Sequence, residues 1–183
     1  MKYSKFMKID KIIVKTKETT YPILVGNGAI SSLKKQVNKL CPNTKKIAVI
    51  FDKNVPNIFK TKIKKLLKKY KIFIKDYSPT EGLKNFSNVN ILIEYLIKNK
   101  FNRNDLVIAV GGGIIGDFSG FVASIFKRGI NFINVPTTLL AQVDSAIGGK
   151  TGVNSKNGKN LIGSFYQPKL VISDISFLNS LPK

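Results

Sequence analysis

Two stretches of the chain combine residue types that bind phosphate and hydroxyl groups. The first is Gly111–Asp117 (GGGIIGD), which follows the apolar, β-branched run Asp105–Val110 and opens a second apolar run. A strand, a glycine turn and a helix start can hold a phosphate, because glycines let the backbone approach the anion and the first helical turn offers unpaired N–H groups. Three of its glycines also fit the dinucleotide pattern G-x-G-x-x-G. The alternative is a tight turn that needs positive φ.

The second stretch is the polar block Gln142–Asn160 (QVDSAIGGKTGVNSKNGKN). It brings together carboxylate, ammonium and amide side chains, namely Asp144, Lys150, Asn154, Lys159 and Asn160. Lysines on a glycine-rich hairpin suit a small phosphorylated substrate that is rich in hydroxyl groups. A solvated loop is the alternative interpretation of this block.

Three further polar residues follow predicted strands. Asp52 stands directly after the buried-type run Lys46–Phe51, where it could accept hydrogen bonds from ribose hydroxyls or serve as a turn or N-cap residue. Thr137 and Thr138 follow the short apolar run Asn131–Val135 and could bind a ligand or cap the next helix.

The hydrophobic pattern predicts an α/β domain over residues 1–183. Apolar β-branched runs predict strands at Lys11–Lys17, Thr20–Val25, Lys46–Phe51, Lys71–Tyr77, Asp105–Val110, Asn131–Val135 and Leu170–Ser173. Helical spacing predicts helices at Ala29–Leu40, Val55–Tyr70 and Phe86–Lys98, and from Ile114 to Phe126. The alternation favours a Rossmann-like layered fold with a largely parallel sheet and an N-terminal β-hairpin. In such sheets ligands bind at the carboxyl ends of the strands.

Composition narrows the classes of function. The formal net charge is +21, but the chain has only Arg103 and Arg128 as arginines and its lysines are scattered, which disfavours nucleic-acid binding as the main function. There is no histidine and only one cysteine, Cys41, so these residues alone predict no zinc or other transition-metal site. No apolar run is long enough for a membrane span and no secretory signal is visible, so we expect a cytoplasmic protein.

Between Asp105 and Pro182 the chain resembles the N-terminal half of the 3-dehydroquinate synthases, in the sugar-phosphate cyclase family. The stretches that carry the resemblance are GGGIIGDFSGFVAS, KRGINFINVPTTLLAQVDSAIGGKTGVN and GKNLIGSFYQPKLVISD. The resemblance implies a lyase of the shikimate pathway, and hence of aromatic amino acid biosynthesis. It converts a phosphorylated seven-carbon sugar acid, 3-deoxy-arabino-heptulosonate 7-phosphate, to 3-dehydroquinate with elimination of phosphate. It also implies bound NAD and a divalent metal, zinc or cobalt.

The resemblance also implies roles for individual residues. Those assigned to the substrate or to catalysis are Asp144, Lys150, Asn160 and Arg128, with Arg128 acting across a homodimer interface. Those assigned to NAD are Asp52, Glu81, Lys84, Gly113, Ile114, Ile115, Gly116, Asp117, Thr137, Thr138, Lys150, Lys159, Phe177, Leu178, Asn179 and Ser180. The loop Pro79-Thr80-Glu81 departs from the Asp-Gly-Glu usual in the family.

The family's chains are roughly twice as long, and their helical second half brings one Glu and two His as metal ligands. The resemblance therefore implies that this chain lacks the metal-binding C-terminal domain, and we expect no synthase activity from it alone. Other readings are an NAD-binding module without catalysis, another sugar-phosphate cyclase, a dehydrogenase of the glycerol or iron-dependent alcohol type, and a basic nucleic-acid-binding domain.

Overall fold

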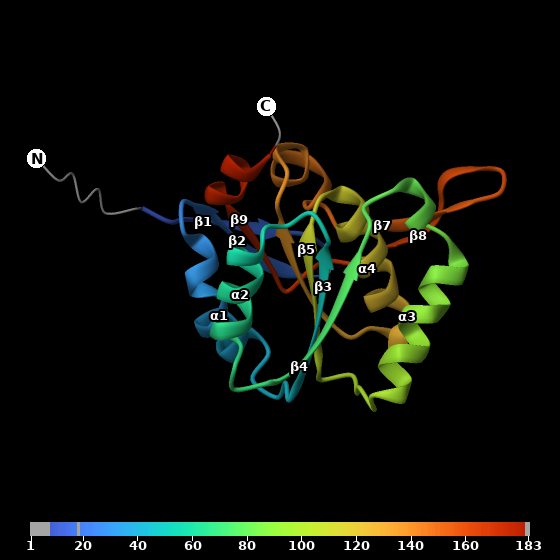
Figure 1. Cartoon of the computed structure of the whole chain (residues 1–183), viewed down its shortest axis with the longest axis horizontal. Helices are drawn as coiled ribbons and strands as arrows, with labels where there is room; N and C mark the ends of the chain where they lie inside the picture. The colour runs from blue at the N-terminus through green and yellow to red at the C-terminus, as the bar shows by residue number, and fades with distance from the viewer. Residues whose placement is uncertain (1–7, 18, 182–183) are drawn as a thin grey trace, which may run out of the picture.

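The computed structural model describes residues 8–17 and 19–181, which form a layered α/β domain (Figure 1). Its described part has a seven-stranded sheet with the order β1-β2-β9-β6-β5-β3-β4. The strands of this sheet are β1 (Asp10–Lys15), β2 (Thr20–Gly26), β3 (Lys46–Asp52), β4 (Lys71–Tyr77), β5 (Leu106–Gly111), β6 (Asn131–Pro136) and β9 (Leu170–Asp174). Only β1 runs antiparallel to its neighbour, so the predicted parallel sheet with an N-terminal hairpin is confirmed.

The order of the strands creates a switch point between β3 and β5. From β3 the chain moves outward to β4, then returns to the other side of β3 as β5 and continues to β6. Connections that leave two adjacent parallel strands in opposite directions open a crevice at the carboxyl ends of those strands. Asp52 and the glycine run Gly111–Gly113 lie at these two carboxyl ends.

Helices cover both faces of the sheet. One face packs against α1 (Leu33–Leu40) and α2 (Asn57–Leu66), and the other against α3 (Phe86–Lys98) and α4 (Gly113–Ile125) (Figure 1). The inner strands are buried on both sides, as in β5, where all six residues are buried. This explains the continuous apolar runs that predicted these strands.

The predicted helix bounds hold within a few residues except at two places. The helix expected at Ala29–Leu40 is divided into a 3-10 turn, Ala29–Ser32, and α1. The lysine-rich helix expected at Val55–Tyr70 is confined to Asn57–Leu66, because Pro56 has an extended ψ of 143° and Leu67 leaves the helical region. Within the described residues no helix is both long and apolar enough to cross a membrane.

The polar block folds into a second, two-stranded sheet of β7 (Lys150–Ser155) and β8 (Gly158–Phe165), preceded by a π-helical turn, η4 (Ala141–Ser145). This hairpin packs on α4 through a glycine. A Cβ at Gly120 would lie 2.5 Å from Thr151 Cγ2. The hairpin therefore sits close against α4 because position 120 has no side chain.

Candidate functional site

A cavity of about 520 Å³, here called the glycine cavity, lies at the switch point of the sheet. Its walls come from the carboxyl ends of β3, β5 and β6 and from η5 (Ile175–Ser180). The lining residues are Asp52, Asn54, Val55, Pro56, Pro79, Gly112, Gly113, Ile114, Thr137, Thr138, Phe177, Ser180 and Leu181. Seven of these residues are among those that the family resemblance assigns to NAD, and they lie together at the carboxyl edge of the sheet.

The glycines at 111–113 allow neighbouring residues to lie close to the backbone, and none of them has a left-handed conformation. Among the described residues, glycines with positive φ occur at positions 26, 28, 129, 148 and 149, so the alternative of a turn that needs positive φ at Gly111–Gly113 is wrong. Instead, a Cβ at Gly111 would lie 2.9 Å from Asp52 Cβ, and one at Gly113 would lie 2.9 Å from Ser145 Oγ. The missing side chains keep the backbone of this turn within reach of a ligand.

Helix α4 begins at the cavity wall, and among the described residues no side chain caps its first turn. The unpaired N–H groups of such a turn, at the positive end of the helix dipole, favour a phosphate. Ile114 lines the cavity, whereas Ile115 is fully buried in the core and Gly116 packs on Asn134. Of the predicted residues Gly113–Asp117, only Gly113 and Ile114 therefore face the glycine cavity.

Asp52 is 7% exposed and lines the glycine cavity. Its Oδ1 accepts the Asn54 N–H at 2.8 Å, so the turn role considered for this residue is present. Its Oδ2 accepts no hydrogen bond from the described residues. One carboxylate oxygen thus holds the turn while the other is available to a ligand.

The two threonines after β6 also combine a structural contact with access to the cavity. Thr137 is 6% exposed and its N–H donates to the Gly111 carbonyl at 2.9 Å, which ties β6 to the glycine run. Thr138 Oγ1 accepts the Ala141 N–H at 3.3 Å, a long capping contact. Both residues line the glycine cavity, so capping and ligand binding do not exclude each other here.

A second cavity of about 450 Å³, here called the hairpin cavity, lies between α4, η4 and the β7–β8 hairpin. It is lined by Asp117, Asp144, Ser145, Ile147, Lys150, Thr151, Gly152, Asn160, Gly163, Ser164 and Phe165. The structure thus brings Asp144, Lys150 and Asn160 to one cavity, as the sequence predicted, and adds Asp117. Two carboxylates, an ammonium and an amide in one cavity suit a ligand that carries both hydroxyl groups and negative charge.

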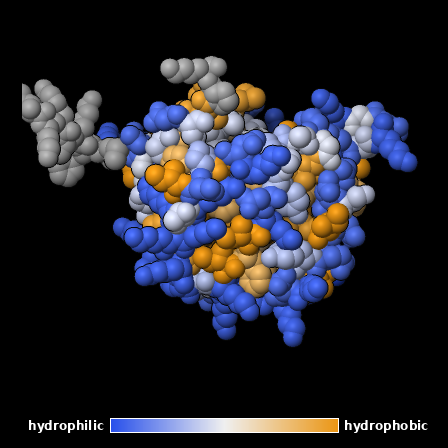
Figure 2. Space-filling view, in the orientation of Figure 1, coloured by the Kyte–Doolittle hydropathy of each residue, from blue (hydrophilic) through white to orange (hydrophobic). Residues whose placement is uncertain are grey.

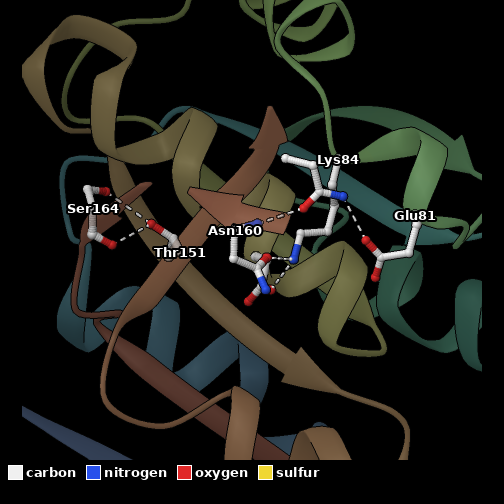
Figure 3. Close-up of polar contacts among 7 residues, drawn as sticks. Glu81, Lys84, Thr151, Asn160 and Ser164 are labelled. Atoms are coloured by element: carbon white, nitrogen blue, oxygen red, sulfur yellow. Dashed lines mark hydrogen bonds and ion pairs between the residues drawn. The ribbon is translucent and has the colours of Figure 1, made fainter. Parts of the chain in front are cut away.

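Lys84 links α4 to the β7–β8 hairpin (Figure 3). Its side chain is 4% exposed, and Nζ lies 2.7 Å from Asp117 Oδ2 and also donates to Asn160 Oδ1. Burial raises the pKa of Asp117, and the hydrogen bond and charge of Lys84 oppose that rise. The buried Lys84 lines neither cavity; it lies behind Asp117 and Asn160, which line the hairpin cavity.

A set of hydroxyl groups that the sequence analysis did not single out lies on the hairpin (Figure 3). Thr151 Oγ1 donates to the Ser164 carbonyl at 2.9 Å, and Ser164 Oγ lies 2.8 Å from Ser124 Oγ on α4. Thr151 and Ser164 line the hairpin cavity. These hydrogen bonds join residues that are 13 and 40 positions apart, so no local sequence pattern predicts them.

Several predicted residues lie outside both cavities. Glu81 is exposed and accepts a hydrogen bond from Asn154 Nδ2 at 2.8 Å, and Lys159 is exposed on β8. In η5, Phe177 and Ser180 line the glycine cavity but Leu178 and Asn179 do not. The exposed Arg128 follows α4, whose 13 residues span about 20 Å, so it is remote from the glycine run, and it lines neither cavity.

The described residues contain no group of three or more His, Cys, Asp or Glu side chains that could hold a metal ion. A zinc or cobalt site does not fit the donor set of residues 8–17 and 19–181, because, of their Asp, Glu, His and Cys side chains, only Asp117 and Asp144 line the hairpin cavity.

The fold is that of a doubly wound α/β domain with one cavity at its topological switch point and a second between α4 and the hairpin. The family model for the N-terminal part of 3-dehydroquinate synthase matches residues 75–183. The 3-dehydroquinate synthase of Pelagibacter ubique (strain HTCC1062) is 51% identical over 178 residues, which are 97% of this chain and 48% of that protein. That of Alkaliphilus metalliredigens (strain QYMF) is 45% identical over 174 residues, 95% of this chain and 48% of that protein.

The chain therefore belongs to the 3-dehydroquinate synthase family, and it spans about half the length of the curated relatives it matches. Among solved structures it is similar to 2-deoxy-scyllo-inosose synthase complexed with carbaglucose-6-phosphate, NAD+ and Co2+. That match has a TM-score of 0.87 and 29% sequence identity, and it covers 94% of this chain and 48% of the other. The resemblance to a sugar-phosphate cyclase half is confirmed.

Proposed function

We propose that this chain is the NAD-binding half of a 3-dehydroquinate synthase that acts in the cytoplasm. In this proposal NAD occupies the glycine cavity and a phosphorylated seven-carbon sugar acid occupies the hairpin cavity. The single observation that carries the proposal is the adjacency of the two cavities on one turn of α4, where Ile114 lines the first and Asp117 the second.

The glycine cavity supports NAD in three ways. The uncapped first turn of α4 offers N–H groups to a pyrophosphate, and position 113 has no Cβ to occupy the space beside Ser145. The free oxygen of Asp52 at the carboxyl end of β3 is placed to accept hydrogen bonds from ribose hydroxyls. NAD, when bound, supplies the capacity to take up and return a hydride.

The residues of the hairpin cavity would bind and orient the sugar acid. Lys150 offers three N–H donors for an anionic oxygen, and Asp144 accepts from hydroxyl groups. Asp117, whose pKa is raised by burial, could hold or release a proton at its carboxylate beside a sugar hydroxyl. Arg128 would act on the phosphate only from a second copy of the chain, as a homodimer would allow.

The metal ligands of a complete synthase would lie outside these 183 residues, in the part that the longer relatives have in addition. We infer that ring formation needs that part, and that mixing this chain with it would restore turnover. A second candidate function is that of another sugar-phosphate cyclase, favoured by the match to the inosose synthase with its bound carbaglucose-6-phosphate. The chain would then prefer a six-carbon sugar phosphate.

Isothermal titration of NAD into the chain tests the cofactor half of the proposal. We expect saturable binding at one site, and at least tenfold weaker binding by Asp52→Asn, which removes the charge that the ribose hydroxyls would use (about 1.4 kcal/mol per tenfold). Asp10→Asn, on the exposed edge strand, is the matched control and should bind as the wild type does. Equal binding by all three proteins, or none by the wild type, would refute the assignment.

Competition between sugar phosphates tests the substrate. With NAD present, 3-deoxy-arabino-heptulosonate 7-phosphate should bind more tightly than glucose 6-phosphate, and Lys150→Met should weaken both. Tighter binding of glucose 6-phosphate would favour the second candidate function. Binding of NAD without either sugar phosphate would leave an NAD-binding module.

A further inference from the structure

Asn154 makes three hydrogen bonds that join separate parts of the site. Its N–H donates to the Lys84 carbonyl at 2.8 Å, and its Nδ2 donates to Glu81 Oε2 at 2.8 Å. Its Oδ1 accepts the N–H of Asn160 at 2.8 Å. One residue of β7 therefore contacts η2 (Glu81–Leu83), the segment just after it, and β8.

The backbone around Asn154 is irregular in a way that makes these contacts possible. The register of the hairpin shifts between Val153 and Ser155, so that Asn154 has no direct partner on β8. The extra residues lie on β8, where positions 159–161 stand opposite Asn154 alone, and a bulge re-aims the groups of the strand that carries it. The Asn160 N–H thereby reaches Asn154 Oδ1, while the Asn154 N–H reaches the Lys84 carbonyl from the outer edge of β7.

Asn160 has the left-handed backbone that its surroundings must stabilise. Its φ is +56°, which is uncommon for a residue other than glycine. Its N–H is held by Asn154 Oδ1, while its own Oδ1 accepts a hydrogen bond from Lys84 Nζ. The position of Asn160 at the wall of the hairpin cavity thus depends on the hydrogen bond between its backbone N–H and Asn154 Oδ1 on the neighbouring strand.

We propose that Asn154 is a positioning residue that fixes Asn160 at the wall of the hairpin cavity and, through Asn160, fixes Lys84 behind that wall. The inference rests on the proposed function for the part that concerns the sugar acid. Asn154 does not line either cavity, so it acts through Asn160 and Lys84 rather than by touching the ligands.

The exchange rate of the Asn160 backbone amide, measured by NMR, tests the positioning directly and needs no ligand. In Asn154→Ala the N–H loses its acceptor, and we expect its exchange to accelerate at least about tenfold. Asn154→Asp keeps an oxygen in place and should retain protection within about threefold. Asn157→Ala, an exposed asparagine in the turn of the same hairpin, is the matched control and should leave the rate unchanged.

Binding of 3-deoxy-arabino-heptulosonate 7-phosphate, measured by calorimetry with NAD present, tests the consequence. We expect Asn154→Ala to raise the Kd for the sugar acid about tenfold, while the melting temperature and the Kd for NAD stay near those of Asn157→Ala. A purely structural role would move all three quantities together.

Unchanged exchange of the Asn160 amide in Asn154→Ala overturns the proposal, as does a parallel loss of NAD affinity and thermal stability. If the wild type binds no sugar phosphate, the proposed function fails. The exchange rates then decide the positioning role by themselves, so the two failures are distinguishable.

Discussion

Lys84 Nζ and Asp117 Oδ2 lie 2.7 Å apart, and the lysine side chain of this pair is almost completely buried. The two residues come from different elements, since Lys84 follows η2 and Asp117 lies in the second turn of α4. Because Lys84 also donates to Asn160, the pair links α4 to the hairpin. The electrostatics of the hairpin cavity therefore depend on a contact between segments that are 33 residues apart in the chain.

The first prediction concerns the titration of Asp117. Burial raises the pKa of Asp117 above its ordinary value of 3.8, and Lys84 lowers it. Replacement Lys84→Met should therefore raise this pKa further, as seen in the ¹³C NMR shift of the carboxyl carbon. Lys156→Met, at an exposed lysine of the hairpin turn, should not change the titration. An unchanged or lower midpoint in Lys84→Met would contradict this account.

The same shift fixes the sign of the pH dependence of stability. The folded state binds the Asp117 proton more tightly than the unfolded state, so the free energy of unfolding falls as the pH rises from 3.8 through the raised folded-state pKa. Asp117→Asn should lack this component. Urea denaturation of both proteins between pH 3.5 and about 7 measures the difference.

The second prediction concerns Asp174, which is fully buried at the end of β9. Its carboxylate accepts the N–H groups of Gly28, Ile30 and Ser176, each at 2.9 Å. Asp174→Asn turns an amide NH₂ toward one of these donors and should lower the free energy of unfolding by about 2 kcal/mol. Asp10→Asn, at an exposed aspartate, should change it by less than about 0.5 kcal/mol in the same urea titration.

The third prediction concerns the contact between α4 and the hairpin. Gly120→Ala would place a Cβ 2.5 Å from Thr151 Cγ2, and the resulting overlap should cost about 1–3 kcal/mol of stability. Thr151→Ser removes that methyl group and keeps the hydroxyl that donates to the Ser164 carbonyl. The double variant should therefore regain most of the loss in thermal denaturation. A double variant no more stable than Gly120→Ala would point to a different cause.

The fourth prediction concerns the space beside the glycine run. Gly113 lines the cavity proposed for NAD, and Gly113→Ala would place a Cβ 2.9 Å from Ser145 Oγ, so the start of α4 would have to shift. We expect at least about tenfold weaker NAD binding in calorimetry, with a change in unfolding free energy below about 1 kcal/mol. Gly82→Ala is the matched control, since its nearest neighbour, Thr80 Oγ1, is 3.6 Å from the added carbon. Full NAD affinity in Gly113→Ala would place the pyrophosphate elsewhere.

Much of the fold could be predicted because its signals are local. The inner strands are continuous apolar runs, and β4 and α3 have the bounds that periodicity gives. Helical spacing also explains why the Ile115 side chain does not face the cavity. Ile115, Phe118 and Val122 follow a 3-4 spacing and form the buried stripe of α4, so only the backbone N–H of Ile115 could serve the cofactor role predicted for it.

The pairing of side chains across the site could not be read from the sequence. The contact of Lys84 with Asn160 spans 76 residues and depends on how the hairpin docks on α4. The spread of hydrophilic side chains over the surface, in contrast, could be predicted from the sequence. Figure 2 shows hydrophilic side chains spread over the visible face, with hydrophobic areas between them, rather than gathered on one element. This agrees with the scattered lysines that disfavoured nucleic acid.

Helix α4 contributes residues near its start to both cavities. Ile114 and Asp117 are three residues apart on one helix, an axial rise of about 4.5 Å, yet they face different cavities. The distance between a dinucleotide and a sugar bound in these cavities would be fixed by one rigid turn of this helix. Their reacting atoms would then be set side by side before any loop or neighbouring domain has moved.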